Sequence, residues 1–186
     1  AEGPPGVESQ CHVDGVIAPM RKLVENTDNR ASAFVIACFS DPGLHSVRET
    51  TAKPVLGIAE CAMLTACTLG DRFGVIAILA ASMPRHRRFI RGLGLDSRFA
   101  GEVPVGLGVT ELADESKTLD RMIECGRRLR DDHGAGVLIM GCAGMARYRQ
   151  RLEDDTGLPV VDPTQAAVTM AIGAVRLGLV TAAQRG

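Results

Sequence analysis

The sequence predicts an α/β fold of two pseudo-symmetric lobes, each a mostly parallel sheet flanked by helices, with a cleft between them. Short apolar runs of strand length alternate with segments of helical periodicity, which is typical of parallel sheets covered by helices. Two of these runs, 33–37 and 136–141, each end directly before a cysteine. The segments after the two cysteines also match in the order of their elements, and this match predicts the two lobes.

The evidence for two similar lobes is the distance from each cysteine to the next proline. Cys38 lies 16 residues before Pro54, and Cys142 lies 17 residues before Pro159. Each proline opens another short apolar run, which is followed by a second helical segment. One cysteine at the end of a strand would mean little, but two in matching positions predict a shared site with one thiol on each wall of the cleft.

The boundaries of the lobes follow from the same match. We expect residues 1–69 together with 159–186 to form the first lobe, and 70–158 to form the second. The second lobe has a strand at 73–79 and a loop ahead of its cysteine unit, whereas nothing equivalent precedes Cys38. We therefore expect that an amino-terminal strand of the first lobe is missing from this chain.

The first half begins with a helix at 12–26, where apolar residues recur at three- and four-residue spacing. Asp41 and Pro42 predict the start of the next helix, because aspartate caps helices and proline is favoured in the first turn. The other expected elements are strands at 31–38 and 55–58 and a helix at 60–69.

In the second half, the run 73–79 is almost wholly apolar and predicts a buried strand. The longest helix is expected at 114–131, where Leu119, Met122 and Leu129 share one face. The other expected elements are strands at 102–109, 137–140 and 160–161 and helices at 85–93, 147–155 and 164–179.

The composition excludes several classes of partner. The 186 residues carry a net charge of −1 with five Phe, one Tyr and no Trp, so neither a basic stripe nor a base-stacking surface for nucleic acid is expected. The longest apolar stretch, 166–180, is interrupted by Arg176 and is shorter than the ~18 residues of a membrane span. The first residues show no signal-peptide pattern, which favours the cytoplasm.

The chemistry is expected at Cys38 and Cys142. Ligands of open parallel sheets bind at the carboxyl ends of strands, and a helix amino terminus there lowers the pKa of a thiol. The six cysteines form no CxxC pair, so we expect free thiols and neither a disulfide framework nor a metal site. The remaining four cysteines are expected to be ordinary core residues: Cys11, Cys61, Cys67 and Cys125.

Other polar residues leave alternatives open. Ser82 follows a strand of the second lobe, where substrate contact is favoured, and Glu60 either caps its helix or contacts substrate. Asp41 is interpreted as a helix cap and not as a base. The four histidines show no ligand spacing and are expected on the surface. The basic run 85–88 is interpreted as a solvated helix face, with an oligomer contact or an anion site as alternatives.

Three segments resemble the hydantoin racemase branch of the aspartate/glutamate racemase superfamily, which includes allantoin racemases. They are Ala-Cys-Phe-Ser-Asp-Pro-Gly-Leu at 37–44, Gly-Ile-Ala-Glu at 57–60 and Gly-Cys-Ala-Gly-Met-Ala at 141–146. The similarity extends over nearly the whole chain from about Gly6. It implies two lobes around an active-site cleft, no cofactor, and a homo-oligomer. Family members usually open with a strand that ends in an Asn-Pro-Asn-Thr-like loop, and this chain has no such stretch.

The resemblance implies racemisation of a small molecule, either a 5-substituted hydantoin or allantoin. Two acid/base groups on opposite walls then exchange a proton on the two faces of one carbon. Cys38 and Cys142 would each serve one enantiomer. The backbone N–H groups that follow the cysteines would hydrogen-bond the enolate and the ring oxygens; these substrate-binding positions are Phe39, Ser40, Ala143 and Gly144.

Three other functions remain open. Amino-acid racemases of the superfamily typically carry a Cys-Asn-Thr-like motif, which is absent after both cysteines. The second alternative is a decarboxylase or cis–trans isomerase, since related proteins share the fold; the decarboxylase needs one thiol, so the paired cysteines argue against it. The third alternative is a non-catalytic module that binds a small molecule in the cleft.

Overall fold

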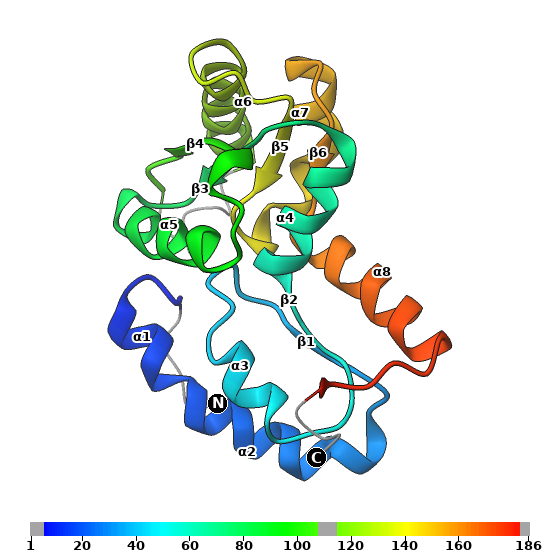
Figure 1. The fold of residues 1–186 in the computed structure, drawn as a ribbon. Coiled ribbons are helices and arrows are strands. Elements are labelled where there is room, and N and C mark those ends of the chain that lie inside the picture. The colour runs from blue at the N-terminus through cyan, green and yellow to red at the C-terminus, as the bar shows by residue number, and fades with distance from the viewer. Residues whose placement is uncertain (1–5, 108–114, 183–186) are drawn as a thin grey trace.

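A computed structural model describes residues 6–107 and 115–182 of the chain. Within these residues the strands form two parallel sheets, and Figure 1 shows them in the lower and upper halves of the molecule. The predicted α/β class with parallel sheets is confirmed. The first sheet pairs β1 (Phe34–Ile36) with β2 (Val55–Gly57). The second sheet has the order β4-β3-β5-β6, with β3 at Phe73–Ala77, β4 at Phe99–Pro104, β5 at Val137–Met140 and β6 at Val160–Val161.

Helices cover these sheets and join their strands (Figure 1). The helices of the first half are α1 (Gln10–Gly15), α2 (Ile17–Thr27), α3 (Leu44–Arg48) and α4 (Ile58–Leu69). Those that follow are α5 (Met83–Gly92), α6 (Glu115–Asp131), α7 (Arg149–Thr156) and α8 (Pro163–Arg176).

The single helix predicted at 12–26 is wrong, because the structure divides it into α1 and α2 at Val16. Pro19 lies in the first turn of α2. Proline has no N–H and cannot bond to the carbonyl of Gly15, so it is tolerated at the start of a helix but interrupts a continuous one. The position of one proline therefore explains the break.

The helix predicted to start at Asp41 and Pro42 begins later, at Leu44, after Gly43 in the left-handed conformation with φ 64°. The Asp41 carboxylate instead accepts hydrogen bonds from the backbone N–H groups of Ala59 (3.0 Å) and Glu60 (2.8 Å). Asp41 is thus a cap, as predicted, but it caps α4 and not the helix that follows it.

The strand predicted at 102–109 begins earlier, at Phe99, because β4 pairs with β3 from Phe73 onward. Residues 108–109, the predicted end of that strand, lie outside the described residues, as does residue 114 at the predicted start of α6. The predictions for β5 and β6 are confirmed.

The two halves share one core, and α4 contacts strands of both sheets. Its buried residues Ile58 and Ala62 belong to the same apolar cluster as Phe73 and Ile139 of the second sheet. As predicted, α8 packs on the first half, against α4, β1 and β2. The lobe boundary at residue 159 stays a prediction; β6 pairs with β5 of the second sheet, and α8 follows it.

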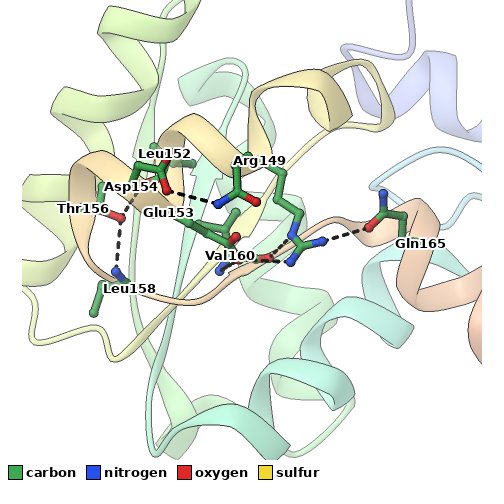
Figure 2. Close-up of polar contacts among 9 residues, drawn as sticks. Arg149, Leu152, Glu153, Asp154, Thr156, Leu158, Val160 and Gln165 are labelled. Atoms are coloured by element: carbon green, nitrogen blue, oxygen red, sulfur yellow. Dashed lines mark hydrogen bonds and ion pairs between the residues drawn. The ribbon is translucent and has the colours of Figure 1, made fainter.

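Arg149 links α7, β6 and α8 where the chain leaves the second sheet (Figure 2). Its guanidinium donates to the carbonyl of Val160 (3.1 Å), to Glu153 of α7 (3.2 Å) and to Gln165 of α8 (3.4 Å). Glu153 in turn accepts from the N–H of Val160 (3.1 Å). These bonds hold β6 in the second sheet although α8 leaves it directly afterwards.

Candidate active site

A cavity of about 260 Å³ lies where the carboxyl ends of β1, β3 and β5 converge, and we call it the cysteine pocket. Both Cys38 and Cys142 line it, as expected for two thiols that share one site, and their catalytic role stays a prediction. The pocket draws its walls from four segments: Gly6, Val7 and Glu8; Ala37, Cys38, Phe39 and Ser40; Ile78, Leu79, Ser82, Arg85 and His86; Gly141, Cys142 and Ala143.

Cys142 is the residue before a 3-10 helix, Ala143–Tyr148, and its Sγ accepts a hydrogen bond from the N–H of Gly144 at 3.3 Å. Burial raises the pKa of the Cys142 thiol, the Gly144 N–H opposes that rise, and the charge of Cys38 adds to it. The influence of one thiol on the other is the behaviour of a coupled pair.

Burial likewise raises the pKa of the Cys38 thiol. The backbone N–H of Ser40 and the positive charge of Arg85 act in the opposite direction, while the charge of Asp41 raises this pKa further. The expectation that a helix amino terminus lowers both thiol pKa values is wrong. The reason is that only a short 3-10 helix follows Cys142 and that α3 begins well past Cys38 and is only five residues long, so desolvation outweighs the helix dipoles.

The other predicted site residues fall into two groups. Phe39, Ser40, Ser82 and Ala143 line the pocket, and the Ser82 hydroxyl donates to the carbonyl of Leu79 at 2.7 Å. Gly144 is not among the lining residues, and its N–H is directed at the Cys142 sulfur.

Glu60 is not among the lining residues either, because its carboxylate forms an ion pair with Arg48. The two groups meet in a bidentate arrangement, with nitrogen–oxygen distances of 2.5 and 3.3 Å. Glu60 lies in the first turn of α4, the helix that Asp41 caps. Its carboxylate is held by Arg48 and does not line the pocket.

The prediction of surface histidines is wrong for His86, which is 4% exposed and lines the pocket. Its Nδ1 lies 2.5 Å from the carboxylate of Glu102 on β4, and its ring packs edge-on against Phe39 with centroids 5.2 Å apart. Ser82, the N-cap residue of α5, is followed at four-residue spacing by His86 and Ile90, and this spacing is a signal that identifies the buried side of the helix.

The adjacent Arg85 also contradicts the interpretation of 85–88 as a wholly solvated face. It is half-buried and lines the pocket, whereas Arg87 and Arg88 are exposed. Burial lowers the pKa of its guanidinium, and the negative charge of Cys38 opposes that effect. The pocket therefore holds a positive charge close to one of the two thiols.

Within 6–107 and 115–182, no group of three or more His, Cys, Asp or Glu side chains is arranged to hold a metal ion. No helix of these residues is long and apolar enough to cross a membrane. All six cysteines are free thiols in the structure. Cys61 and Cys125 are buried, as expected, but the expectation of a core residue is wrong for Cys11, which is exposed, and Cys67 is only partly buried.

Comparison with known proteins identifies the family. A sequence model described as Asp/Glu/Hydantoin racemase matches residues 1–171. The hydantoin racemase of Paenarthrobacter aurescens is 35% identical over 155 residues, or 83% of this chain and 66% of that protein. The hydantoin racemase of Pseudomonas sp. (strain NS671) is 34% identical over 181 residues, or 95% of this chain and 72% of that protein. The chain thus spans 66% to 72% of the length of these two relatives.

Solved structures agree with the sequence relatives. Allantoin racemase from Pseudomonas fluorescens superimposes with a TM-score of 0.92 at 31% identity, covering 98% of this chain and 78% of that one. The chain therefore belongs to the Asp/Glu/Hydantoin racemase family.

Proposed function

We propose that this protein is a cofactor-independent racemase of 5-substituted hydantoins or allantoin that uses Cys38 and Cys142 as its two acid/base groups. The observation that carries the proposal is the presence of both thiols, from different halves of the molecule, in one pocket. Proteins named hydantoin racemase and allantoin racemase are its relatives, which supports this substrate class.

The proposed reaction is a proton exchange at the ring stereocentre. One cysteine, as thiolate, takes the hydrogen, and the electron pair of the broken C–H bond moves into the ring as an enolate. The other cysteine, as thiol, gives its proton to the opposite face of the same carbon and becomes the new thiolate. The balance needs no oxidant and no second reactant, which is the logic of two-base acid–base catalysis.

The pocket supports one thiolate at a time. Each thiol has a raised pKa in the buried site, and the charge of Cys38 raises that of Cys142 further. The N–H groups of Ser40 and Gly144 hydrogen-bond the two sulfurs, which stabilises whichever sulfur is ionised.

The test is isotope exchange with single-thiol variants. Cys38→Ser and Cys142→Ser should each abolish racemisation, because a two-base mechanism assigns one thiol to each face of the substrate. In deuterated water each variant should still exchange the ring hydrogen of one enantiomer without inverting it, and the two variants should prefer opposite enantiomers. Polarimetry on pure enantiomers of allantoin and of benzyl- and isopropylhydantoin, with mass spectrometry of recovered substrate, measures both effects.

Two results contradict the two-thiol assignment: exchange of the same enantiomer by both variants, or racemisation at the wild-type rate by either one. Serine preserves the size of the side chain, so thermal unfolding of each variant controls for misfolding. Cys11→Ser, a substitution of an exposed cysteine, is the matched control and should racemise normally. If the wild-type protein binds a hydantoin but exchanges neither enantiomer, the non-catalytic binding module is the correct interpretation.

A further inference from the structure

Two nitrogen atoms of Arg85, Nε and Nη2, are buried without a hydrogen-bond partner among the described residues. The third nitrogen, Nη1, donates to the carbonyl of Ala81 at 3.3 Å in the preceding turn. A buried donor left unpaired is destabilising, more so when it is charged, so a well-formed site is expected to supply an acceptor. Nε and Nη2 form the edge of the guanidinium that donates two hydrogen bonds to one oxygen or to a carboxylate.

The acceptor is not a neighbouring acidic side chain. Glu102 influences the charge of Arg85, but its carboxylate is bonded to His86. Arg85 lines the cysteine pocket together with both thiols. Its positive charge lowers the pKa of Cys38, so it acts on one of the two sulfurs.

Two of the four backbone donors that the sequence assigned to the enolate are engaged elsewhere. The N–H of Gly144 points at the sulfur of Cys142, and the N–H of Ser40 acts on that of Cys38. An enolate that forms between the thiols is therefore stabilised by a further donor. Arg85, which lines the same pocket, has two nitrogens without a partner.

We propose that Arg85 is a third catalytic residue, which binds through Nε–H and Nη2–H the ring oxygen that becomes negative in the racemase reaction. This inference rests on the proposed function. When a thiolate takes the hydrogen of the stereocentre, the C–H electron pair forms a carbon–carbon double bond, and the carbonyl pair moves onto the oxygen held by Arg85. Protonation by the other thiol reverses these shifts. The guanidinium stays protonated throughout, so it stabilises charge and transfers no proton.

The kinetic test is Arg85→Gln, with Arg87→Gln as the matched control because Arg87 is exposed on the same helix and does not line the pocket. Removal of one preorganised donor from a developing oxyanion lowers kcat about 100- to 1000-fold. We expect a loss of this size for both enantiomers of a neutral 5-alkylhydantoin, with little change in KM, since the charge exists only after deprotonation. Arg85→Lys should lose less, because it keeps the charge.

A loss confined to KM, or seen only for hydantoins that carry a carboxylate on the side chain, overturns the proposal and makes Arg85 a substituent-binding residue. An unchanged kcat in Arg85→Gln overturns it outright. Thermal unfolding of the three variants controls for their folding.

A second measurement is independent of racemase activity. Iodoacetate carries a carboxylate that fits the free edge of Arg85, whereas iodoacetamide is neutral. For Cys38 of the wild-type protein, the ratio of the two alkylation rates should exceed that of the exposed Cys11, as read by mass spectrometry of each cysteine. Arg85→Gln should bring the Cys38 ratio down to that of Cys11, and Arg87→Gln should leave it unchanged.

An equal ratio in the wild-type protein and in Arg85→Gln overturns the inference whatever the protein catalyses. If the ratio falls as expected but the wild-type protein racemises no hydantoin, the proposed function fails while the oxyanion-binding role of Arg85 is supported.

Discussion

Asp41 connects the loop of one thiol to the helix α4. Its side chain is 4% exposed and its φ is 40°, a backbone conformation that few residues other than glycine adopt. Burial raises its pKa from 3.8 to about 7, although the N–H groups of Glu60 and Ala59 favour the ionised form. The same carboxylate raises the pKa of Cys38. One residue therefore affects both the stability of the fold and the chemistry of the pocket.

Asp41 should make the protein less stable as the pH rises from about 4 to 7. A group whose folded pKa is raised contributes its stability fully below the unfolded pKa and loses it as the pH passes through the folded value. The free energy of unfolding in urea should therefore fall over this interval, by an amount on the order of a few kcal/mol. In Asp41→Asn, which keeps the size and does not titrate, this fall should be absent. Parallel pH profiles of the two proteins would contradict the raised pKa.

Asp41→Asn should also shift the titration of one thiol and not the other. Removal of the carboxylate charge should lower the pKa of Cys38, whereas Asp41 is not among the groups that shift Cys142. The rate of iodoacetamide alkylation, followed against pH for each cysteine, should move to lower pH for Cys38 only. An equal movement at both cysteines would point to a general loosening of the pocket.

The raised thiol pKa values predict an alkaline rate profile for the wild-type protein. At neutral pH only a small fraction of the buried pair is ionised, and one thiolate is required. The value of kcat/KM should therefore rise from pH 7 to pH 9. A profile that is flat over this range would show that a group other than the free thiol pair limits the reaction.

At the scale of elements, the position of Cys142 depends on how closely β5 approaches β3. The N–H of Gly141 bonds to the carbonyl of Ile76 at 2.8 Å. A Cβ at position 141 would lie 2.5 Å from that oxygen and 3.1 Å from the Cα of Ala77. Both are backbone atoms, which cannot rotate away, so only glycine fits directly before this thiol.

Gly141→Ala should push the end of β5 away from β3 and destabilise the protein by about 1–3 kcal/mol, the usual cost of overpacking a core. It should also lower racemase activity through the displacement of Cys142. Urea unfolding measures the first effect and polarimetry the second. Gly173→Ala in α8 is the control, since a Cβ there meets nothing within 4 Å and alanine favours a helix interior by up to about 1 kcal/mol. A normally stable Gly141→Ala would show that the strands separate freely.

At the scale of the whole molecule, α8 packs against α4 but also leaves apolar side chains in water. Val168, Ile172 and Val175 recur on α8 at spacings of four and three residues, and all are exposed. Leu64 and Leu69 of α4 are exposed as well. A stripe of this kind along packed helices is typical of a surface that is covered by another chain. It supports the proposal that the protein is a homo-oligomer; its location in the cytoplasm stays a prediction.

If the protein forms the proposed homo-oligomer through this stripe, Ile172→Asp should convert it to a smaller species, because a charge in an apolar interface is left unpaired and desolvated. Size-exclusion chromatography with light scattering measures the mass. Thr169→Asp places the same charge at a neighbouring exposed position that is not part of the apolar stripe, and it should leave the mass unchanged. A wild-type protein that is already monomeric would contradict the proposal.

The sequence by itself determined the fold class, the parallel strands and the expectation that the two thiols line one pocket. The spacing of apolar residues and the distance from each cysteine to the following proline are properties of single segments. They can therefore be read from the sequence without knowing which segments pack together in the fold. The limits of β5 and β6 matched the sequence prediction for the same reason. The two lobe boundaries were inferred from symmetry and stay predictions. Symmetry is weaker evidence than local pattern, because β6 pairs with β5 of the second sheet and its own sequence does not identify that partner.

Only the tertiary structure decided which polar groups are buried and which residues they contact. Asp41 caps a helix that begins 17 residues later, and His86 meets Glu102 of another element. Arg85 looks like any basic residue of an amphipathic helix until its neighbours remove water from two of its nitrogens. The rise of both thiol pKa values has the same cause. Desolvation depends on every segment that surrounds a group, and those segments come together only when the chain has folded.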